Sequence, residues 1–340
     1  MAPSPRKTLA VILAAGKGVR MKSKLPKVLT PLMGKPMVHF VAEACRVAKI
    51  KQILLVIGYQ ADLVRETMGS GFQYAEQTQQ LGTGHALMVA VKTLGQFKGD
   101  ILVLAGDTPL LNGQILRRLI TKHQKSGAAA TMMTAVLDQP GGYGRIVRKP
   151  SGSIDRIVEA RDATAQEKKI KEVNTSHYCF KAEKVIPLLS NLNTNNDQGE
   201  YYLTDIIEML VGKGEKVESL TSDDPNILLG VNNRSHLADI QKIMQSSICN
   251  NLMAKGVSLI DPASVIIETE VKIAPDTIIH PFTSLLGKTS IKSGSHIGPH
   301  VKLKNAVIGE NCRIEFSVIE GRKIEDNTVI GPFAGIYGED

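Results

Sequence analysis

The sequence predicts an α/β domain built on a mainly parallel, Rossmann-like sheet, followed by a short β-helix. Two observations support this assignment. Up to about residue 232, buried-type apolar runs alternate with amphipathic segments, whereas beyond residue 256 an aliphatic residue recurs at every sixth position. The 340 residues suffice for two domains, which we place at 1–232 and 256–340 with a linker helix over 233–255.

The first domain shows regular alternation of strand and helix patterns. Short apolar runs bounded by turn residues predict buried strands at Leu9–Ala15, Ile53–Gly58, Ile101–Gly106 and Ala128–Leu137. Amphipathic segments between them predict helices at Pro36–Ala48, Ala61–Met68, Gly84–Leu94 and Gln114–Lys125. This alternation favours a mainly parallel sheet covered on both faces, with ligands beyond the carboxyl ends of the strands.

The second domain follows a helix predicted over residues 235–254. From Ile267 to Leu303 an aliphatic residue occupies every sixth position; after a slip the pattern resumes at Ile308 and Ile314, and then at Ile324, Ile330 and Ile336. Such a repeat is typical of a hexapeptide β-helix, in which successive turns stack aliphatic residues into one core. Its flat faces would be covered by sister chains, so we expect an oligomer.

A glycine-rich loop follows the first predicted strand. Gly16-Lys17-Gly18 lets backbone amides approach anionic oxygens, and the four cations that follow add positive charge: Arg20, Lys22, Lys24 and Lys27. A Walker A loop is excluded, because no Lys-Ser or Lys-Thr pair follows the second glycine. The dinucleotide fingerprint is excluded as well, because no third glycine occurs near Met21. The loop therefore predicts a phosphate site of another kind.

Composition excludes several classes of protein. The net charge is +8, but the cations are scattered and aromatic residues make up only 4%, which argues against a nucleic-acid partner. No apolar stretch is long enough to cross a bilayer, so we expect no membrane partner and a cytoplasmic protein. The apolar run at Leu9–Ala15 is at the short limit for a secretory signal, and dense positive charge follows it. The four widely spaced cysteines fit free thiols in a reducing compartment.

Eight motifs occur in order along the chain. They are L-A-A-G-x-G-x-R-M with L-P-K (13–27), Q-x-x-Q-L-G-T-G-H-A (77–86), G-D-T-P-L (106–110), G-Y-G-R-I (142–146), I-V-E-A-R-D-A (157–163), N-T (174–175), G-E-Y-Y-L-T-D (199–205) and G-V-N-N-R (230–234). Together they resemble bacterial N-acetylglucosamine-1-phosphate uridylyltransferases. In that family the α/β domain is joined to a left-handed β-helix, and the resemblance covers nearly the whole chain.

The resemblance implies a nucleotidyltransferase that makes UDP-N-acetylglucosamine and pyrophosphate from UTP and the sugar 1-phosphate. Asp107 and Asn232 would hold Mg²⁺, a cation that prefers oxygen ligands, although adjacent Asn233 is an alternative. Arg20 and Lys27 would act in catalysis by neutralising charge on the phosphates. The nucleotide set comprises Leu13, Ala14, Ala15, Gly16, Lys27, Gln77, Gly82 and Thr83.

Within this set, the Gln77 amide and the Gly82 backbone would bind the uracil edge. A glutamine amide donates and accepts at once, which suits the O4/N3 edge of uracil. The sugar set comprises Gly144, Glu159, Asn174, Tyr201 and Thr204. His85 is not needed as a general base, because a phosphate monoester is already ionised near neutral pH, and we expect it to pack at a helix start.

The sequence departs from the family pattern at several positions. Val19 replaces a hydroxyl residue, Ala105 replaces a larger one, and Ser176 stands where the family has glycine after Asn-Thr. These changes bear on sugar specificity more than on nucleotide transfer. The acetyl-CoA site of the bifunctional enzymes has no counterpart in the sequence, so we expect no acetyl transfer.

Several alternatives stay open at this point. Another sugar phosphate, or dTTP, would suit the same fold, although thymidylyltransferases usually carry a G-G-x-G-T-R-L loop. A non-catalytic regulatory subunit has the same two domains, but retention of Arg20, Lys27, Asp107 and Asn232 argues against loss of activity. The resemblance favours a homotrimer formed through the β-helix, whereas the sequence leaves oligomer size, regulation and the source of the substrate open.

Overall fold

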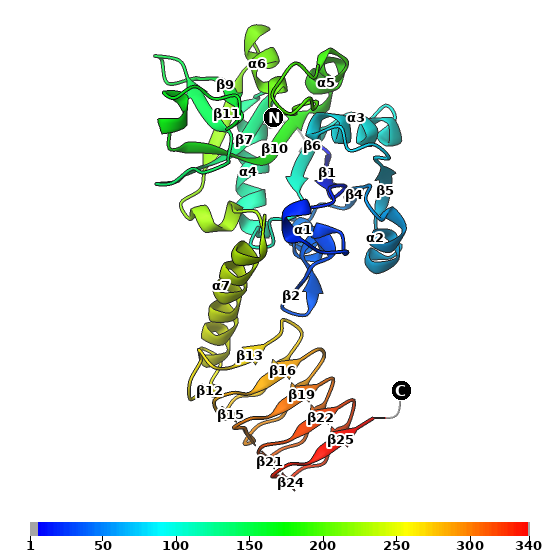
Figure 1. Cartoon of the computed structure of the whole chain (residues 1–340), viewed down its shortest axis with the longest axis vertical. Coiled ribbons are helices and arrows are strands. Elements are labelled where there is room, and N and C mark those ends of the chain that lie inside the picture. Colours follow the sequence, from blue (N-terminus) through cyan, green and yellow to red (C-terminus); the bar gives the residue numbers. More distant parts are fainter. Residues whose placement is uncertain (1–5, 339–340) are drawn as a thin grey trace, which may run out of the picture. The chain divides into compact units, whose positions relative to one another are not determined.

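The structure, a computed structural model, describes residues 6–338, and the chain divides into two compact units (Figure 1). The first unit comprises Met1–Thr30 and Pro36–Arg234, and the second comprises Pro31–Lys35 and Ser235–Asp340. The first unit is an α/β sheet domain and the second consists of a helix and a β-helix.

The first unit contains a sheet in the order β11-β7-β10-β6-β1-β4-β5. These strands are β1 (Thr8–Leu13), β4 (Gln52–Ile57), β5 (Gln73–Glu76), β6 (Asp100–Ala105), β7 (Ala130–Val136), β10 (Glu172–Lys181) and β11 (Val217–Thr221). A hairpin of β8 (Arg145–Arg148) and β9 (Ile154–Val158) joins the sheet at β10. Along this order β10 runs antiparallel to its neighbours β6 and β7 and the other pairs are parallel, while the hairpin β8–β9 is antiparallel to β10; the expected mainly parallel sheet is confirmed.

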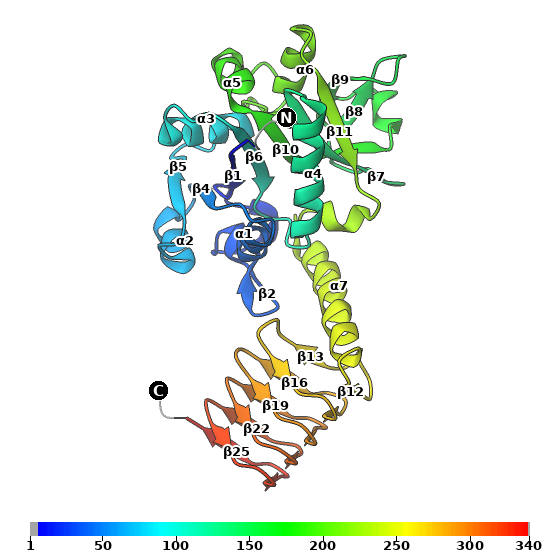
Figure 2. The same ribbon diagram turned by 180° about the vertical axis from the view of Figure 1, so that it is seen from behind.

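Helices cover both faces of this sheet (Figure 2). Leu9 and Val11 of β1 point into one core, which α3 (Thr83–Leu94), α5 (Ala182–Val185) and α6 (Asp205–Gly212) cover. Ala10 and Ile12 point into the other core, which α1 (Met37–Val47), α2 (Ala61–Met68) and α4 (Gly113–Ser126) cover. Because successive strand residues face opposite sides, a strand between two helical layers must be apolar at every position, as this one is.

The four predicted strands and four predicted helices of this unit are confirmed, with ends shifted by at most two residues. The sequence interpretation missed β5, the hairpin β8–β9, β10, β11, α5 and α6. The case of β10 has a clear cause. Its centre is the polar run Asn174-Thr175-Ser176-His177, where the pairing with β7 is interrupted by a bulge, so neither an apolar run nor an alternation is present.

From Ser235 on, the second unit consists of α7 (Arg234–Met253), close to the predicted 235–254, followed by three parallel sheets. Their strands are β12 (Ser258–Leu259), β13 (Ile266–Ile267), β14 (Lys272–Ile273), β15 (Ile278–Ile279), β16 (Ser284–Leu286), β17 (Ser290–Ile291), β18 (His296–Ile297), β19 (Lys302–Lys304), β20 (Val307–Ile308), β21 (Arg313–Ile314), β22 (Val318–Glu320), β23 (Lys323–Ile324), β24 (Val329–Ile330) and β25 (Gly335–Tyr337). Two further short strands, β2 (Pro31–Leu32) and β3 (Lys35–Pro36), pair with each other.

Three stacked parallel sheets of short strands form a left-handed hexapeptide β-helix. The six-residue repeat predicted the β-helix, and the family resemblance predicted its left hand. The slip in the repeat reflects shorter turns. Along one face Ile279 pairs with Ile297, 18 positions later, but Ile314 pairs with Ile330, only 16 positions later. Ile319, which the six-residue pattern omitted, occupies a buried core position between Leu303 and Ile336.

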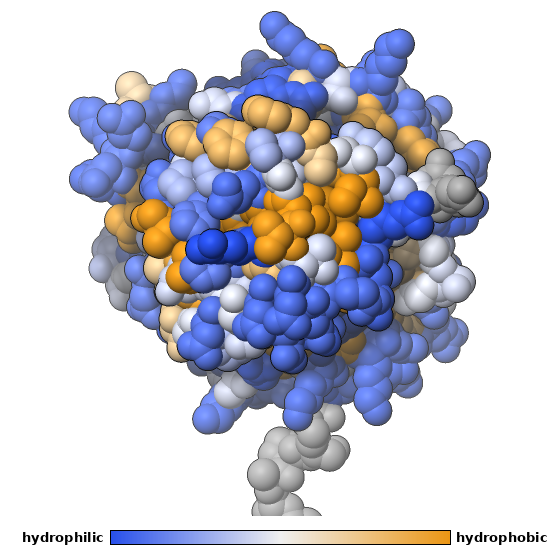
Figure 3. Space-filling view, turned by 90° about the horizontal axis from the view of Figure 1, so that it is seen from below, coloured by the Kyte–Doolittle hydropathy of each residue, from blue (hydrophilic) through white to orange (hydrophobic). Residues whose placement is uncertain are grey.

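A ladder of aromatic rings runs along the β-helix. The rings of Phe282, His300, Phe316 and Phe333 follow one another with centroid distances of 5.0, 5.3 and 6.1 Å. Phe282 is 60% exposed and Phe333 is 85% exposed. The view from below shows apolar side chains gathered in the middle of an otherwise hydrophilic face (Figure 3). We call the row of these four rings the aromatic ladder.

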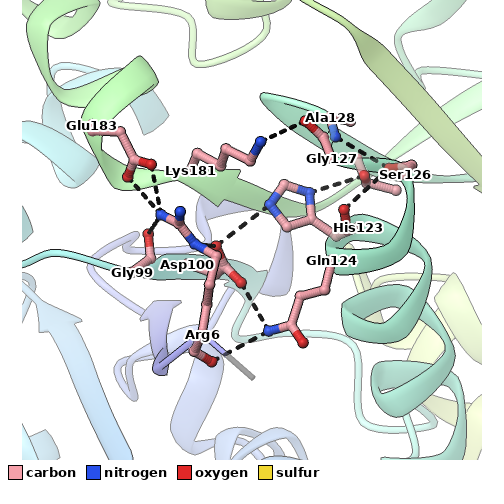
Figure 4. Close-up of polar contacts among 11 residues, drawn as sticks. Arg6, Gly99, Asp100, His123, Gln124, Ser126, Gly127, Ala128, Lys181 and Glu183 are labelled. Carbon is pink, nitrogen blue, oxygen red and sulfur yellow. Dashed lines mark hydrogen bonds and ion pairs between the residues drawn. The ribbon is translucent and has the colours of Figure 1, made fainter. Parts of the chain in front are cut away.

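A buried charge cluster lies at the start of β6 (Figure 4). Asp100, fully buried, accepts hydrogen bonds from Arg6 Nε and Gln124 Nε2 at 2.9 Å each, and His123 Nε2 lies 3.7 Å from its carboxylate. Burial alone would raise the pKa of Asp100, but the surrounding donors and charges outweigh burial and lower it. This cluster holds the first residue of β6 against α4.

Within residues 6–338, no helix is both long and apolar enough to cross a membrane. The four cysteines in this range are all buried and free of disulfides, as expected for structural thiols.

Candidate active site

The glycine loop and the G-D motif start from neighbouring strand ends. Leu13, the last residue of β1, pairs with Ala105, the last residue of β6, and Gly106 N donates to Leu13 O at 3.0 Å. A Cβ at Gly106 would lie 2.8 Å from that carbonyl, so only glycine allows this approach. Register therefore brings the residues after Leu13 and the residue after Gly106 to one edge of the sheet.

Lys27 and Asp107 form an ion pair at this edge. The ammonium of Lys27 contacts Oδ2 of Asp107 and also donates to Oδ1 of Asn232 at 3.1 Å. The two charged side chains are largely shielded, with 14% and 22% of their surfaces exposed. Arg20, from a short 3-10 helix at Val19–Met21, donates to the same Asn232 oxygen at 2.9 Å. The structure thus brings together all four residues that the sequence assigned to metal and phosphate.

Asn232 reaches this position because the loop that carries it is hydrogen-bonded to, and packed against, Asp107. Val231 N donates to the Asp107 carbonyl at 2.9 Å, and Gly230 packs so closely that a Cβ there would lie 3.3 Å from Asp107 Oδ1. The side-chain oxygen of Asn232 therefore faces the cations of Arg20 and Lys27, and the Asp107 carboxylate faces Lys27.

Four of the predicted nucleotide residues lie at the end of β1 and at the start of α3. Ala14 and Ala15 are buried, and Ala15 O accepts from Tyr59 N, which fixes the glycine loop against the end of β4. The side chain of Leu13 is partly buried and packs against the hydrophobic core on one face of the sheet. Thr83, the first residue of α3, accepts from Leu203 N at 3.2 Å through its hydroxyl.

Gln77 follows β5 and is almost fully buried. Its Nε2 donates to Gly82 O at 3.1 Å and lies 3.0 Å from Nδ1 of His85. The expected packing of His85 at a helix start is found, since it is the third residue of α3, but its contact with Gln77 was not foreseen.

The predicted sugar residues cluster around Glu159. Oε1 of Glu159 accepts from the Thr204 hydroxyl at 3.1 Å, and a Cβ at Gly144 would lie 3.4 Å from Oε2. Burial raises the pKa of Glu159; the Thr204 hydrogen bond opposes this, and the nearby carboxylates of Asp162, Asp205 and Glu200 add to it. The Glu159 carboxyl group is therefore protonated more readily than a carboxyl group in water. Its Oε1 is bonded to Thr204, and Oε2 remains for a ligand.

Asn174 lies beside this group on β10. Its Nδ2 donates to the Tyr178 hydroxyl at 2.7 Å, its Oδ1 accepts from Ser176 N at 3.2 Å, and its backbone N donates to Gly144 O. Ser176 adopts a φ of +60°, the left-handed conformation that glycine tolerates best. The replacement of the family's glycine by Ser176 therefore leaves the backbone in the conformation that glycine would allow.

Tyr201 and the Gln77–Thr83 segment form one connected structure. Tyr201 N donates to Leu81 O and Gly84 N donates to Tyr201 O, both at 2.8 Å. A Cβ at Gly82 would lie 2.7 Å from the Tyr201 carbonyl, so Gly82, at φ +103°, is required for this approach. The predicted base and sugar residues are thereby joined through the backbone.

Sequence reasoning missed two residues of this region, Tyr143 and Arg145. The Tyr143 hydroxyl accepts from Gly230 N at 3.3 Å, which links the loop before Gly144 to the loop that carries Asn232. Arg145, almost fully buried, donates to the carbonyls of Tyr143 and Gly141. Both belong to the G-Y-G-R-I motif, and that motif was the only signal that could have indicated them.

Comparison with known proteins supports the motif assignment. The family model described as nucleotidyl transferase matches residues 9–225. The protein named Bifunctional protein GlmU from Halalkalibacterium halodurans is 44% identical over 96% of this chain and 72% of its own length. The proteins of the same name from Geobacillus sp. and Caldanaerobacter subterraneus are 44% and 42% identical, each over 97% of this chain and 72% of the relative.

The matched span includes β1, β6 and most of the residues that meet at the edge of the sheet. The relatives extend the match into the β-helix, because they align with nearly the whole chain. The chain therefore belongs to the nucleotidyl transferase family, and within it to the UDP-N-acetylglucosamine pyrophosphorylase type that its motifs predicted.

Proposed function

We propose that the chain is a Mg²⁺-dependent uridylyltransferase that joins UTP to N-acetylglucosamine 1-phosphate. An oxygen of the sugar phosphate attacks the α-phosphorus of UTP, the bond from that phosphorus to the bridging oxygen breaks, and pyrophosphate leaves. The observation that carries the proposal is the meeting of Lys27, Asp107, Asn232 and Arg20 at one edge of the sheet.

The oxygens of Asp107 and Asn232 fit a bound cation. The Lys27 ammonium lies between them and contacts both, so the pair already holds one positive charge. Carboxylate and amide oxygens suit Mg²⁺, which usually takes one or two protein ligands and completes its shell with water and substrate phosphates. When bound, the ion would neutralise phosphate charge and polarise the reacting phosphoryl group.

The residues of the chain have distinct tasks in this reaction. Lys27 and Arg20 supply the fixed cations that two anionic reactants need in order to approach, and they stabilise the charge that develops on pyrophosphate. No group is required to remove a proton, because the attacking phosphate oxygen is already ionised near neutral pH. The remaining task is to hold both reactants in line.

The sugar residues are suited to orientation. Glu159 and Thr204 present paired oxygens, and Gly144 lets backbone approach a sugar hydroxyl closely. Asn174 has one N–H of its amide left after its bond to Tyr178, which suits one acceptor on the sugar or its acetamido group.

The test is release of pyrophosphate from a panel of nucleotides and sugar 1-phosphates, with and without Mg²⁺. We expect UTP with N-acetylglucosamine 1-phosphate to be the best pair, and Asp107→Ala to abolish most turnover. Asp138→Ala is the control, since Asp138 is highly exposed and pairs with Lys171 on the surface. Preference for dTTP or another sugar, or near-normal activity of Asp107→Ala at limiting Mg²⁺, would overturn the assignment. The absence of acetyl transfer stays a prediction, which an assay with acetyl-CoA and glucosamine 1-phosphate tests.

We also propose that the β-helix assembles as a homotrimer. The aromatic ladder supports this, because the side chains of Phe282, Phe316 and Phe333 are exposed and sister chains would cover them. We expect the full chain to sediment as a trimer, and Phe316→Ser with Phe333→Ser to shift it toward monomer. Sedimentation of the unmodified chain as a monomer would refute this proposal and leave the catalytic one standing.

A further inference from the structure

The side chain of Gln77 is held by two protein groups on α3 and the loop before it. Nε2 donates to Gly82 O at 3.1 Å and lies 3.0 Å from His85 Nδ1. The backbone of Gln77 is fixed too, because its N donates to Ile57 O and its carbonyl accepts from Gln80 Nε2. The amide therefore has one defined position in a buried environment.

The chemistry of these partners determines which way the amide faces. A carbonyl oxygen only accepts, so the amide atom that faces Gly82 O must be the nitrogen. The same nitrogen faces His85 Nδ1, so that ring nitrogen must accept, and the proton of the neutral imidazole lies on Nε2. Gly82 O also accepts from Ala86 N at 3.1 Å, so it holds two donors.

Both N–H groups of the Gln77 amide are consequently used within the protein. The oxygen Oε1 is the part of the amide that is left for a ligand, and it can only accept. This differs from the expectation that Gln77 donates and accepts at once. A group that only accepts suits the N3–H of uracil, whereas cytosine presents an unprotonated N3 at the same place.

We propose that His85 is a positioning residue that makes the site select uracil over cytosine, by holding the Gln77 amide with Oε1 toward the base. The proposal rests on the proposed function, in which the Gln77 loop binds the base of UTP. The His85 ring packs beside the Tyr201 ring, with centroids 6.3 Å apart, and this contact keeps Nδ1 directed at Gln77.

The role of His85 can be derived from the effect that removal of its side chain would have on the Gln77 amide. Without the acceptor at Nδ1, one N–H of a nearly buried amide loses its partner, and the bond to Gly82 O alone fixes the amide less strictly. The Gln77 side chain then adopts other positions, in which its N–H groups can donate to cytosine N3. Selection against cytosine falls, although the phosphate and metal residues are untouched.

The experiment compares two polar variants of His85 in the full chain. In His85→Asn the amide is attached at Cγ, as Nδ1 is in histidine, so Oδ1 can accept from Gln77. In His85→Gln the amide is attached one carbon further out and cannot reach the Nδ1 position. His85→Leu removes the acceptor altogether, and Thr93→Ala on the exposed side of α3 is the control.

The measurement is the ratio of kcat/KM for UTP to that for CTP. We expect His85→Asn and Thr93→Ala to stay within about 2-fold of the unmodified ratio, and His85→Gln and His85→Leu to lower it about 10-fold, the loss of one hydrogen bond. KM for UTP should rise with kcat nearly retained, because the base is remote from the reacting phosphorus.

The outcomes separate this inference from the proposed function. If the unmodified chain does not turn over UTP, the proposed function fails. If it does, but His85→Gln keeps the UTP preference, or His85→Asn loses it equally, His85 does not position Gln77 and the inference is wrong. The comparison of two polar variants decides the matter even where His85→Leu fails to fold.

Discussion

Lys27 occupies the place that the proposed function gives to a metal ion. Removal of its charge should therefore strengthen Mg²⁺ binding but slow turnover. The Lys27 ammonium contacts both Asp107 and Asn232. A divalent ion that binds these oxygens must displace the ammonium or tolerate it nearby. Lys27→Met keeps the length of the side chain and removes the charge. We expect this variant to bind Mg²⁺ more tightly in the absence of nucleotide, yet to turn over more slowly.

The magnitude follows from the burial of the pair. Unit charges about 4 Å apart interact by about 4 kcal/mol in an effective dielectric of about 20. Part of this is lost, because the side chains retain 14% and 22% of their exposure and the free carboxylate is rehydrated when Lys27 is removed. We take about 1.4 kcal/mol as the net free energy by which the Lys27 ammonium opposes Mg²⁺ binding. Its removal in Lys27→Met then corresponds to about 10-fold tighter Mg²⁺ binding.

The assay is calorimetric titration of the nucleotide-free protein with Mg²⁺, repeated with Mn²⁺ followed by electron paramagnetic resonance. Lys24→Met is the matched control, since Lys24 lies on the same loop and is exposed. Turnover of Lys27→Met should fall by about 10²-fold or more, because a fixed cation is lost from the phosphates. Unchanged or weaker Mg²⁺ binding by Lys27→Met would refute the reasoning, whatever the turnover.

Three further predictions concern stability, measured by urea unfolding. Ser176→Gly should raise the free energy of unfolding by about 1 kcal/mol, since it relieves the left-handed φ of +60°; a loss of stability would show that the serine hydroxyl matters more. Burial, with the charges of Glu208 and Asp162, raises the pKa of Asp205 to about 6 from 3.8, so the folded state holds an extra proton between these values and stability falls as pH rises through them. Asp205→Asn should therefore stabilise the protein by about 1 kcal/mol at pH 8, after allowance for solvent screening, and by almost nothing at pH 4; an equal effect at both pH values would contradict this. Asp100→Asn should cost about 2 kcal/mol, because it breaks a buried charge cluster, and leave kcat unchanged at temperatures where the variant is folded; loss of kcat in the folded variant would show that the cluster acts on the site.

Sequence patterns predicted the parts of the fold that packing alone determines. Leu9–Ile12 and Ile101–Leu104 lie between two helical layers, so every position is apolar and the strands are evident from composition. The β-helix is evident for the same reason, since each turn must supply an aliphatic residue to one core. The shorter turns near Ile314 could not be predicted, because a corner can lose a residue without any change in the aliphatic residues.

The site was predictable as a set of residues and less so as a geometry. Motif order identified Lys27, Asp107 and Asn232, and the register of β1 with β6 explains why the first two meet. No pattern could show that both N–H groups of Gln77 are already engaged, because that depends on where α3 places His85. Donor and acceptor assignments belong to tertiary contacts, and a residue type alone does not determine them.

Strand β6 shows how environment, and not residue type, assigns a role to a carboxylate. Asp100 at its first residue is fully buried and surrounded by Arg6, Gln124 and His123, so its oxygens are occupied by protein donors. Asp107, just beyond the last residue, keeps 22% of its side chain exposed and pairs with Lys27, a flexible side chain that can move away. One aspartate is therefore committed to the fold, whereas the other can exchange its partner for a ligand. The two lie about 20 Å apart along the strand, which separates the stability of the sheet from the chemistry at its edge.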